Sequence, residues 1–169
     1  MQSGITIRAM EAADAKRFSD AFAAQGWQKP EKQFLAYLSE QESGSRYCLS
    51  AEKDGEIAGY VTVLPRAAAG PFAQLSLPEI SDFNVLIRFR RLGIGSALLS
   101  AAEEIAFRFS DTVTLGVGLH SGYGAAQRMY IKRGYVPDGS GVWYEDKPLL
   151  QNAICRNDDD LVLYLSRQR

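Results

Sequence analysis

The chain has 169 residues, of which 46% are apolar and 23% are charged, and its formal net charge is -1. This length is typical of one globular domain, so we predict a single domain over residues 1–169. A nearly neutral chain has no general attraction for polyanions, and we therefore expect no nucleic-acid partner.

The sequence contains no pattern that is typical of a targeting or membrane-spanning segment. The start, Met1–Met10, lacks an apolar h-region, and the longest largely apolar run, Ile57–Leu64, is too short to cross a bilayer. Cys48 and Cys155 are far apart and have no metal-ligand spacing. We expect a cytoplasmic protein that binds neither a membrane nor a metal and whose thiols are buried or idle.

The first third of the chain predicts a strand followed by two helices. Alternation of apolar and polar residues over Ile5–Ala9 indicates a short strand. The next helix is expected to be capped by Asp14 and to end at Gly26, and a second helix is expected to begin at Pro30.

A hairpin and a long loop are predicted next. The β-rich runs Tyr47–Ala51 and Ile57–Leu64 are separated by Asp54-Gly55, which is a strong signal for an antiparallel hairpin. Residues 65–78 contain prolines, a glycine and three alanines in a row, and we interpret them as a loop long enough to reach over a site.

The second half alternates between strand and helix patterns before it returns to strands. The expected elements are a strand at Glu79–Leu86, a helix at Gly95–Phe107, a strand at Thr112–Val117, a helix at Tyr123–Lys132 that ends at Gly134, and strands at Tyr135, Val142–Tyr144 and Leu161–Leu165.

The stretch that carries chemistry is a glycine turn between the central strand and its helix. Gly93 and Gly95 allow a tight turn and close approach of a ligand, and the helix amides beyond them favour a phosphate. Neighbouring arginines at 88, 90 and 91 suit a diphosphate. A plain strand-to-helix turn is the simpler alternative. A dinucleotide fingerprint would need a glycine at Leu98, and no Walker motif occurs.

Two motifs resemble those of the Gcn5-related N-acetyltransferases. Arg90-x-x-Gly93-x-Gly95 matches the family's R/Q-x-x-G-x-G/A segment, and Ala125–Tyr135 is similar to its A-x-x-L-Y-x-x-x-G-F segment. The order of elements matches the family along the chain. The resemblance implies an α/β (mixed α+β) fold with a central, mostly antiparallel mixed sheet of about seven strands flanked by about four helices.

The resemblance also implies acetyl-CoA as co-substrate. The residues it assigns to binding are Val85, Ile87, Arg90, Arg91, Leu92, Gly93, Ile94, Gly95, Ser96 and Tyr123. Two positions depart from the family pattern, because Ile87 stands where many members have proline and Tyr123 where many have asparagine. These departures leave the side-chain contacts to the pantetheine arm open.

A base is useful because a lysine-like amine is only about 0.1% neutral near pH 7.4. Glu79 lies eleven residues before Arg90, where some family members carry a catalytic glutamate, while the position used more often is Ser81. Asp82 is the rival, and a water relay is a third possibility. Strand parity would put Glu79 and Asp82 on opposite faces.

The second motif places Tyr130 where the family has a general acid that protonates the departing thiolate. Its alternative role is packing of the helix. His120, the only histidine, is interpreted as a turn residue.

These residues predict an N-acetyltransferase that acetylates a primary amine by direct attack. The acceptor is a small molecule or a peptide, and the sequence does not identify it. The alternative is a coenzyme A-binding module of the same fold without transfer activity, and a dinucleotide-binding protein is a third possibility. We expect a monomer or a homodimer.

Overall fold

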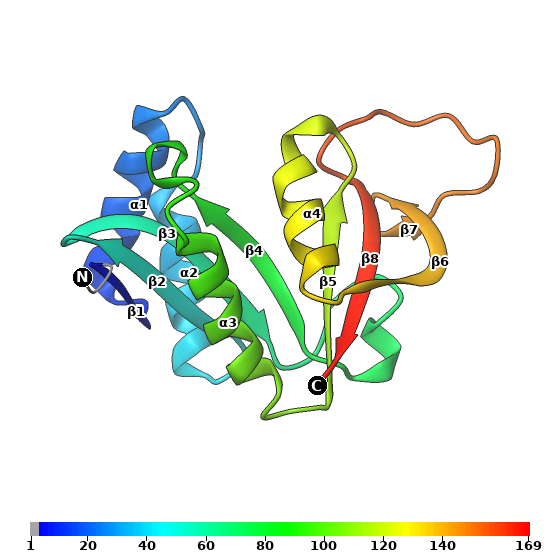
Figure 1. Cartoon of the computed structure of the whole chain (residues 1–169), viewed down its shortest axis with the longest axis horizontal. Helices are drawn as coiled ribbons and strands as arrows, with labels where there is room; N and C mark the ends of the chain where they lie inside the picture. Colours follow the sequence, from blue (N-terminus) through cyan, green and yellow to red (C-terminus); the bar gives the residue numbers. More distant parts are fainter. Residues whose placement is uncertain (1–3) are drawn as a thin grey trace. The chain divides into compact units, whose positions relative to one another are not determined.

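The computed structural model describes residues 4–169, and the chain packs as two compact units (Figure 1). Unit 1 consists of the chain up to Leu64 together with Ser81–Ile105, and unit 2 consists of Pro65–Ile80 together with Ala106–Arg169. Residues 1–3, which belong to the start inspected for a targeting segment, lie outside the described residues. One domain over the whole chain remains a prediction.

Unit 1 contains the strand, the two helices and the hairpin that the sequence predicts. Asp54 and Gly55 both have positive φ, 51° and 84°, as the tight hairpin turn requires. The elements are β1 (Ile5–Ala9), α1 (Ala12–Ala24), α2 (Glu31–Glu42), β2 (Tyr47–Lys53), β3 (Glu56–Leu64), most of β4 (Glu79–Val85) and α3 (Ile94–Ala106). Strand β2 pairs antiparallel with both β1 and β3.

The core of unit 1 is aromatic. Phe18 on α1 stacks on Phe34 of α2 with 5.3 Å between ring centroids. Tyr60 on β3 meets Phe18 and Phe34 edge-on at 5.1 and 5.2 Å, and all three side chains are fully buried. Large aromatic rings remove much apolar surface from water, so this cluster fixes both helices against β3.

The cap of α1 differs from the prediction. Glu11 is the N-cap, and Asp14 lies in the first turn, where its carboxylate accepts the Glu11 N–H at 2.9 Å. Asp14 is buried and also forms an ion pair with Arg8 at 2.6 Å. Asp14 therefore caps the helix from its first turn, and the ion pair with Arg8 of β1 holds its carboxylate in place.

Unit 2 is built on antiparallel strands around β8 (Leu161–Gln168). This strand pairs with β5 (Thr112–Gly118) and with β6 (Val136–Tyr144), and the first residues of β4 pair in parallel with β5. The remaining elements are α4 (Gly124–Lys132) and the two-residue strand β7 (Lys147–Pro148).

The separate strands expected at Tyr135 and Val142–Tyr144 are one strand, β6. Its pairing with β8 shifts between Pro137 and Val142. Gly139 and Gly141 lie in this interval with φ of 87° and 77°, so the chain bulges there and then resumes pairing. The bulge interrupts the strand pattern in the sequence, which explains why the sequence predicts two strands here.

The segment 65–78, expected to be a loop, contains the 3₁₀ turn η1 (Ala73–Leu75). Phe72 packs edge-on against Tyr164 of β8 at 6.1 Å, in a cluster that also contains Ala67. This part of the loop is therefore anchored within unit 2. Whether it borders a site remains a prediction.

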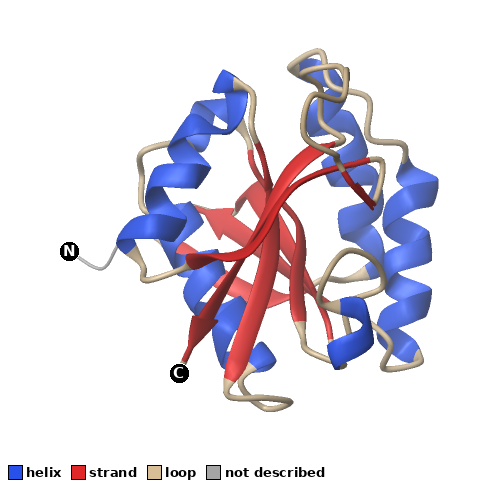
Figure 2. Cartoon of the chain, turned by 90° about the vertical axis from the view of Figure 1, so that its right-hand side faces the viewer, coloured by secondary structure: helices blue, strands red, loops and turns tan. Residues whose placement is uncertain are grey.

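The predicted fold class is confirmed (Figure 2). The strand order is β1-β2-β3-β4-β5-β8-β6-β7, and the strand beyond the expected seven is the short β7. Within residues 4–169, no helix combines the length and apolarity needed to cross a membrane. The same described part of the chain contains no group of three or more His, Cys, Asp or Glu side chains that could hold a metal ion.

Candidate active site

The predicted phosphate loop joins the 3₁₀ turn η2 (Ile87–Phe89) to α3. Arg91 and Gly93 both have left-handed backbone, with φ of 63° and 84°. The carbonyl of Gly93 accepts the N–H of Ala97 at 3.0 Å, which closes the first turn of α3. Alternating left-handed residues turn main-chain N–H groups toward one point, and such concavities bind anions. Because left-handed backbone is unfavourable for arginine, the loop has the features of a built binding element.

The amides of Gly95 and Ser96 lie within that first turn. Amides in the first turn of a helix have no carbonyl of their own helix to bond, and they lie at the positive end of the helix dipole. Arg91, Leu92 and Ser96 are exposed, whereas Ile94 is buried. Ile94 could therefore contact a ligand only through its main chain.

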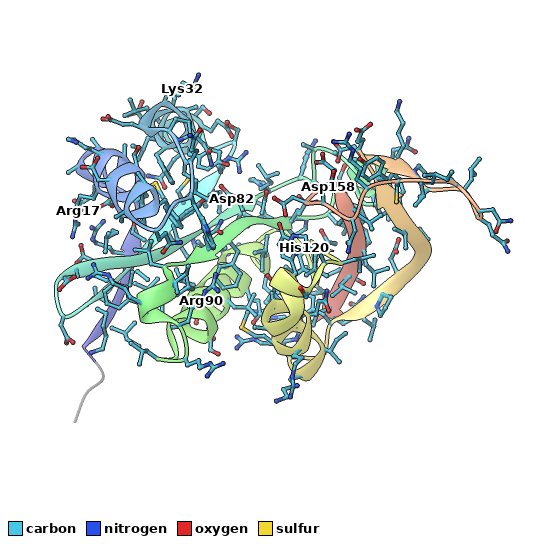
Figure 3. The ribbon with its side chains drawn as sticks, turned by 90° about the horizontal axis from the view of Figure 1, so that it is seen from above. Arg17, Lys32, Asp82, Arg90, His120 and Asp158 are labelled. Carbon is cyan, nitrogen blue, oxygen red and sulfur yellow. The ribbon has the colours of Figure 1, made fainter. Side chains whose placement is uncertain are left out.

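The arginines of the loop have different surroundings. Arg90, labelled in Figure 3, lies over the ring of Trp27 at 5.5 Å, and its Nε donates a long hydrogen bond of 3.4 Å to the carbonyl of Val85. Arg88 forms an ion pair with Glu56 at 2.6 Å. Arg90 therefore touches Val85, another residue assigned to the cofactor.

The structure divides the predicted site residues between the two units. Unit 1 contains one continuous segment with Val85, Ile87, Arg90, Arg91, Leu92, Gly93, Ile94, Gly95 and Ser96. Unit 2 contains Glu79, Tyr123 and Tyr130. The binding assignments remain predictions.

A cluster of polar side chains around Asp82 was not predicted. Asp82 has left-handed backbone with φ of 45°, which breaks the regular alternation of β4 and removes the parity argument that separated it from Glu79. Its carboxylate accepts hydrogen bonds from Tyr60 at 2.7 Å, Tyr37 at 2.8 Å, Asn84 at 2.9 Å, Gln33 at 3.0 Å and Lys29 at 3.3 Å. Asp82, which is labelled in Figure 3, belongs to unit 1.

These contacts occupy Asp82 as an acceptor. Two carboxylate oxygens offer about four lone-pair positions, and five donors already share them. Burial, and then the negative charge of Asp82, raise the pKa of both Tyr37 and Tyr60, so the two phenols stay protonated and remain donors. A substrate amine would therefore compete with these donors for a hydrogen bond to Asp82.

Tyr130 lies on α4 and is buried, with 6% of its surface exposed. Its ring meets that of Tyr135 edge-on at 5.7 Å. Burial raises the pKa of the Tyr130 phenol, with a smaller contribution from Tyr123, so the hydroxyl carries its proton at neutral pH. A protonated phenol can donate to a thiolate, and the raised pKa makes it a weaker acid than an exposed tyrosine.

Tyr123 is held by the turn before α4. Its hydroxyl donates to Asp159 at 3.0 Å, and a Cβ added at Gly118 would come within 2.3 Å of its ring. His120 accepts the N–H of Gly122 on Nδ1 at 3.0 Å, so Nε2 carries the hydrogen and donates to Asp159 at 2.8 Å. These contacts agree with the interpretation of His120 as a turn residue.

Glu79 begins β4 and is half-buried. Burial, together with the negative charge of Glu79, raises the pKa of Tyr164 to about 12. The candidate base therefore lies near a phenol that keeps its proton.

Residues 10–135 match the family model described as "Acetyltransferase (GNAT) family". The chain belongs to this family. The suspected resemblance is thus confirmed, as is the prediction of an N-acetyltransferase at the level of the family.

One similar curated protein is an N-alpha-acetyltransferase of Sulfurisphaera tokodaii. It is 30% identical over an alignment of 132 residues, and the match covers 69% of this chain and 75% of the relative. Among solved structures, an acetyltransferase of Salmonella typhimurium determined with acetyl-CoA is 19% identical and has a TM-score of 0.69. The match covers 98% of this chain and 94% of the Salmonella chain. A ribosomal-protein-alanine N-acetyltransferase of Brucella melitensis is also 19% identical, with a TM-score of 0.69 and coverage of 97% of this chain and 99% of its own. At these identities the structures support the fold alone.

Proposed function

We propose that this protein transfers the acetyl group of acetyl-CoA to a primary amine by direct attack. The observation that carries the proposal is the left-handed loop at Arg91 and Gly93, which leads into the first turn of α3, where Ser96 is exposed. Family membership and the acetyl-CoA in the Salmonella relative support the same donor.

The chain's own residues suit recognition of this donor. The amides of the loop and of the first turn of α3 would bind the pyrophosphate, with Arg90 and Arg91 adding positive charge. The main chain of Val85 would contact the arm that carries the thioester, and Tyr123 is a further proposed contact to the cofactor. Acetyl-CoA would supply an activated acetyl group, and the protein would bind and orient it.

Two proton transfers complete the proposed reaction. The amine nitrogen forms a bond to the acetyl carbon while the carbon–sulfur bond breaks, and the electron pair leaves on sulfur. Glu79, directly or through water, would accept the proton that the amine loses. Tyr130 would donate its phenolic proton to the thiolate. The five donors on Asp82 favour Glu79 or a water relay over Asp82 as the base.

A peptide α-amine is the first acceptor to test, because the relative from Sulfurisphaera tokodaii is named an N-alpha-acetyltransferase. Polyamines, amino acids and lysine side chains complete the panel. Release of coenzyme A thiol is measured for each amine, with reactions that lack protein or amine as controls. Release with at least one amine above both controls supports the enzyme.

The alternative is a coenzyme A-binding module of the same fold without transfer activity. It predicts that acetyl-CoA binds, as measured by calorimetry, while no amine in the panel releases thiol above the controls. Absence of acetyl-CoA binding would contradict both functions.

A further inference from the structure

The end of α1 is joined to the start of turn η2 by one side chain. Gln25, the C-cap residue of α1, accepts the main-chain N–H of Ile87 on its Oε1 at 3.0 Å. Ile87 is the first residue of η2, and an N–H at that position has no partner within its own turn. The direction of this bond fixes the Gln25 amide, because only its oxygen can accept from a main-chain N–H.

Gln25 makes this contact in an unfavourable setting. Its Nε2 is buried and has no hydrogen-bond partner, the single such side-chain atom among residues 4–169. A buried donor without an acceptor destabilises a fold, and an apolar side chain at position 25 would avoid that penalty. The bond that Oε1 accepts from Ile87 is therefore the hydrogen bond that offsets this penalty.

A second contact joins the same two segments. Trp27, two residues beyond Gln25, stacks on Phe22 of the core at 6.0 Å and lies under the guanidinium of Arg90 at 5.5 Å. Phe89, inside η2, packs against the same core. The turn that precedes the phosphate loop is therefore held at its first residue by Gln25 and just beyond its last residue by Trp27.

We propose that Gln25 is a positioning residue for acetyl-CoA binding. It fixes the N–H of Ile87, so that η2 starts at a defined point and the loop from Arg90 to Gly95 is presented in its phosphate-binding conformation. Gln25 itself need not touch the ligand. The inference rests on the proposed function in one respect, namely that this loop binds the pyrophosphate of acetyl-CoA.

The backbone at this point allows a direct test, because proline can replace the tethered N–H. Leu86 has φ of -56° and ψ of 139°, the extended conformation that a residue before proline adopts. Ile87 opens a 3₁₀ turn, where the fixed φ of proline fits, and half of its side-chain surface is exposed. A hollow of about 560 Å³ lined by Ala21, Ala24 and Gln25 provides room for the ring once Gln25 is shortened.

Three variants separate the tether from other effects: Gln25→Ala, Gln25→Ala with Ile87→Pro, and Gln25→Ala with Ile87→Ala. The dissociation constant of acetyl-CoA is measured by calorimetry. The turnover number kcat is measured with the amine from the panel that reacts fastest. Gln25→Ala should weaken binding roughly 3- to 10-fold, the range of one net hydrogen bond, and leave kcat at saturation within about 2-fold. Proline at 87 should restore most of the affinity, because it fixes φ and removes the unpaired donor. Alanine at 87 keeps the donor and should not.

Amide hydrogen exchange at Phe89 and Arg90 gives a second measure. Both amides are bonded inside the turn, to the carbonyls of Leu86 and Ile87 at 2.9 and 3.2 Å. Gln25→Ala should speed their exchange, and the proline variant should slow it again. Unchanged affinity and exchange in Gln25→Ala, or equal rescue by alanine and proline, would overturn the proposal. Failure of the wild-type protein to bind acetyl-CoA would instead contradict the proposed function together with the role of Gln25 in binding, and exchange would then show only whether Gln25 fixes the start of η2.

Discussion

Tyr130 is the residue whose environment bears most directly on the proposed chemistry. Because burial raises the pKa of its phenol, the group remains protonated throughout the neutral range and into alkaline solution. Tyr130→Phe removes the hydroxyl but keeps the ring that packs against Tyr135. We expect kcat to fall about 10²- to 10⁴-fold, because general acid catalysis typically contributes this much, with little change in stability or in acetyl-CoA affinity.

The test of Tyr130 measures kcat, the acetyl-CoA dissociation constant and the unfolding midpoint of the same preparation. The raised pKa also predicts that wild-type kcat does not decline between pH 8 and 10 through ionisation of this phenol. Turnover near the wild-type value in the folded variant would show that Tyr130 only packs its helix.

The phosphate loop gives a second prediction at the scale of single residues. Gly95→Asp places a side chain and a negative charge at the first-turn amides of α3, so acetyl-CoA binding should be abolished. Arg90→Ala removes one cation but leaves those amides in place, so affinity should fall only about tenfold. Calorimetry on both folded variants checks this order. Unchanged affinity in Gly95→Asp would show that the pyrophosphate binds elsewhere.

At the scale of elements, Gly59 sets the distance between β3 and β4. A Cβ added there would lie 2.6 Å from the carbonyl oxygen of Asn84 and 3.1 Å from the Cα of Val85. Gly59→Ala must therefore displace the β4 backbone at a residue that we assign to the cofactor. We expect a loss of stability of about 1–3 kcal/mol and weaker acetyl-CoA binding. Ala58→Gly, one residue away, is the control for strand flexibility, and denaturant unfolding with calorimetry provides both readouts.

The junction of β1, α1 and β2 predicts a dependence of stability on pH. Burial alone would raise the pKa of Asp14. The pKa is nevertheless lowered, because Arg8, the Glu11 N–H and Ser50 donate hydrogen bonds to the carboxylate. A pKa that is lower in the folded state than in the unfolded state stabilises the fold at pH values above the unfolded-state pKa of about 3.9. This contribution is lost as the pH falls through the folded-state pKa. Asp14→Asn should lower the free energy of unfolding by about 3 kcal/mol near pH 7, and by less at pH 3. Urea unfolding at both pH values measures the difference, and an equal loss at the two would contradict the assignment.

Elements with local causes were predicted well from the sequence. The turn at Asp54-Gly55 and the stop at Gly26 depend on backbone conformations that a few adjacent residues determine. The cluster on Asp82 was missed because every donor except Asn84 is distant in sequence, from 22 residues for Tyr60 to 53 for Lys29. The only feature in the sequence that pointed to this cluster was Tyr60, a residue with a polar hydroxyl inside the largely apolar strand β3. For the same reason no local pattern could reveal that Gln25 bonds to Ile87, 62 residues away.

At the scale of the whole molecule, the proposed donor should stabilise the folded protein. A ligand that binds only the folded state at 100 times its dissociation constant adds about 2.7 kcal/mol, which for a chain of this size corresponds to roughly 5–10 °C in Tm. Acetyl-CoA and free coenzyme A should both produce this shift, because the proposed phosphate contacts do not require the acetyl group. NAD at the same concentration should produce none, since the loop lacks the third glycine of a dinucleotide fingerprint at Leu98. Gly95→Asp is the matched control, in which the shift with coenzyme A should disappear while the Tm without ligand stays close to that of the wild type. A shift with NAD as large as that with acetyl-CoA would contradict the assignment of the loop to coenzyme A.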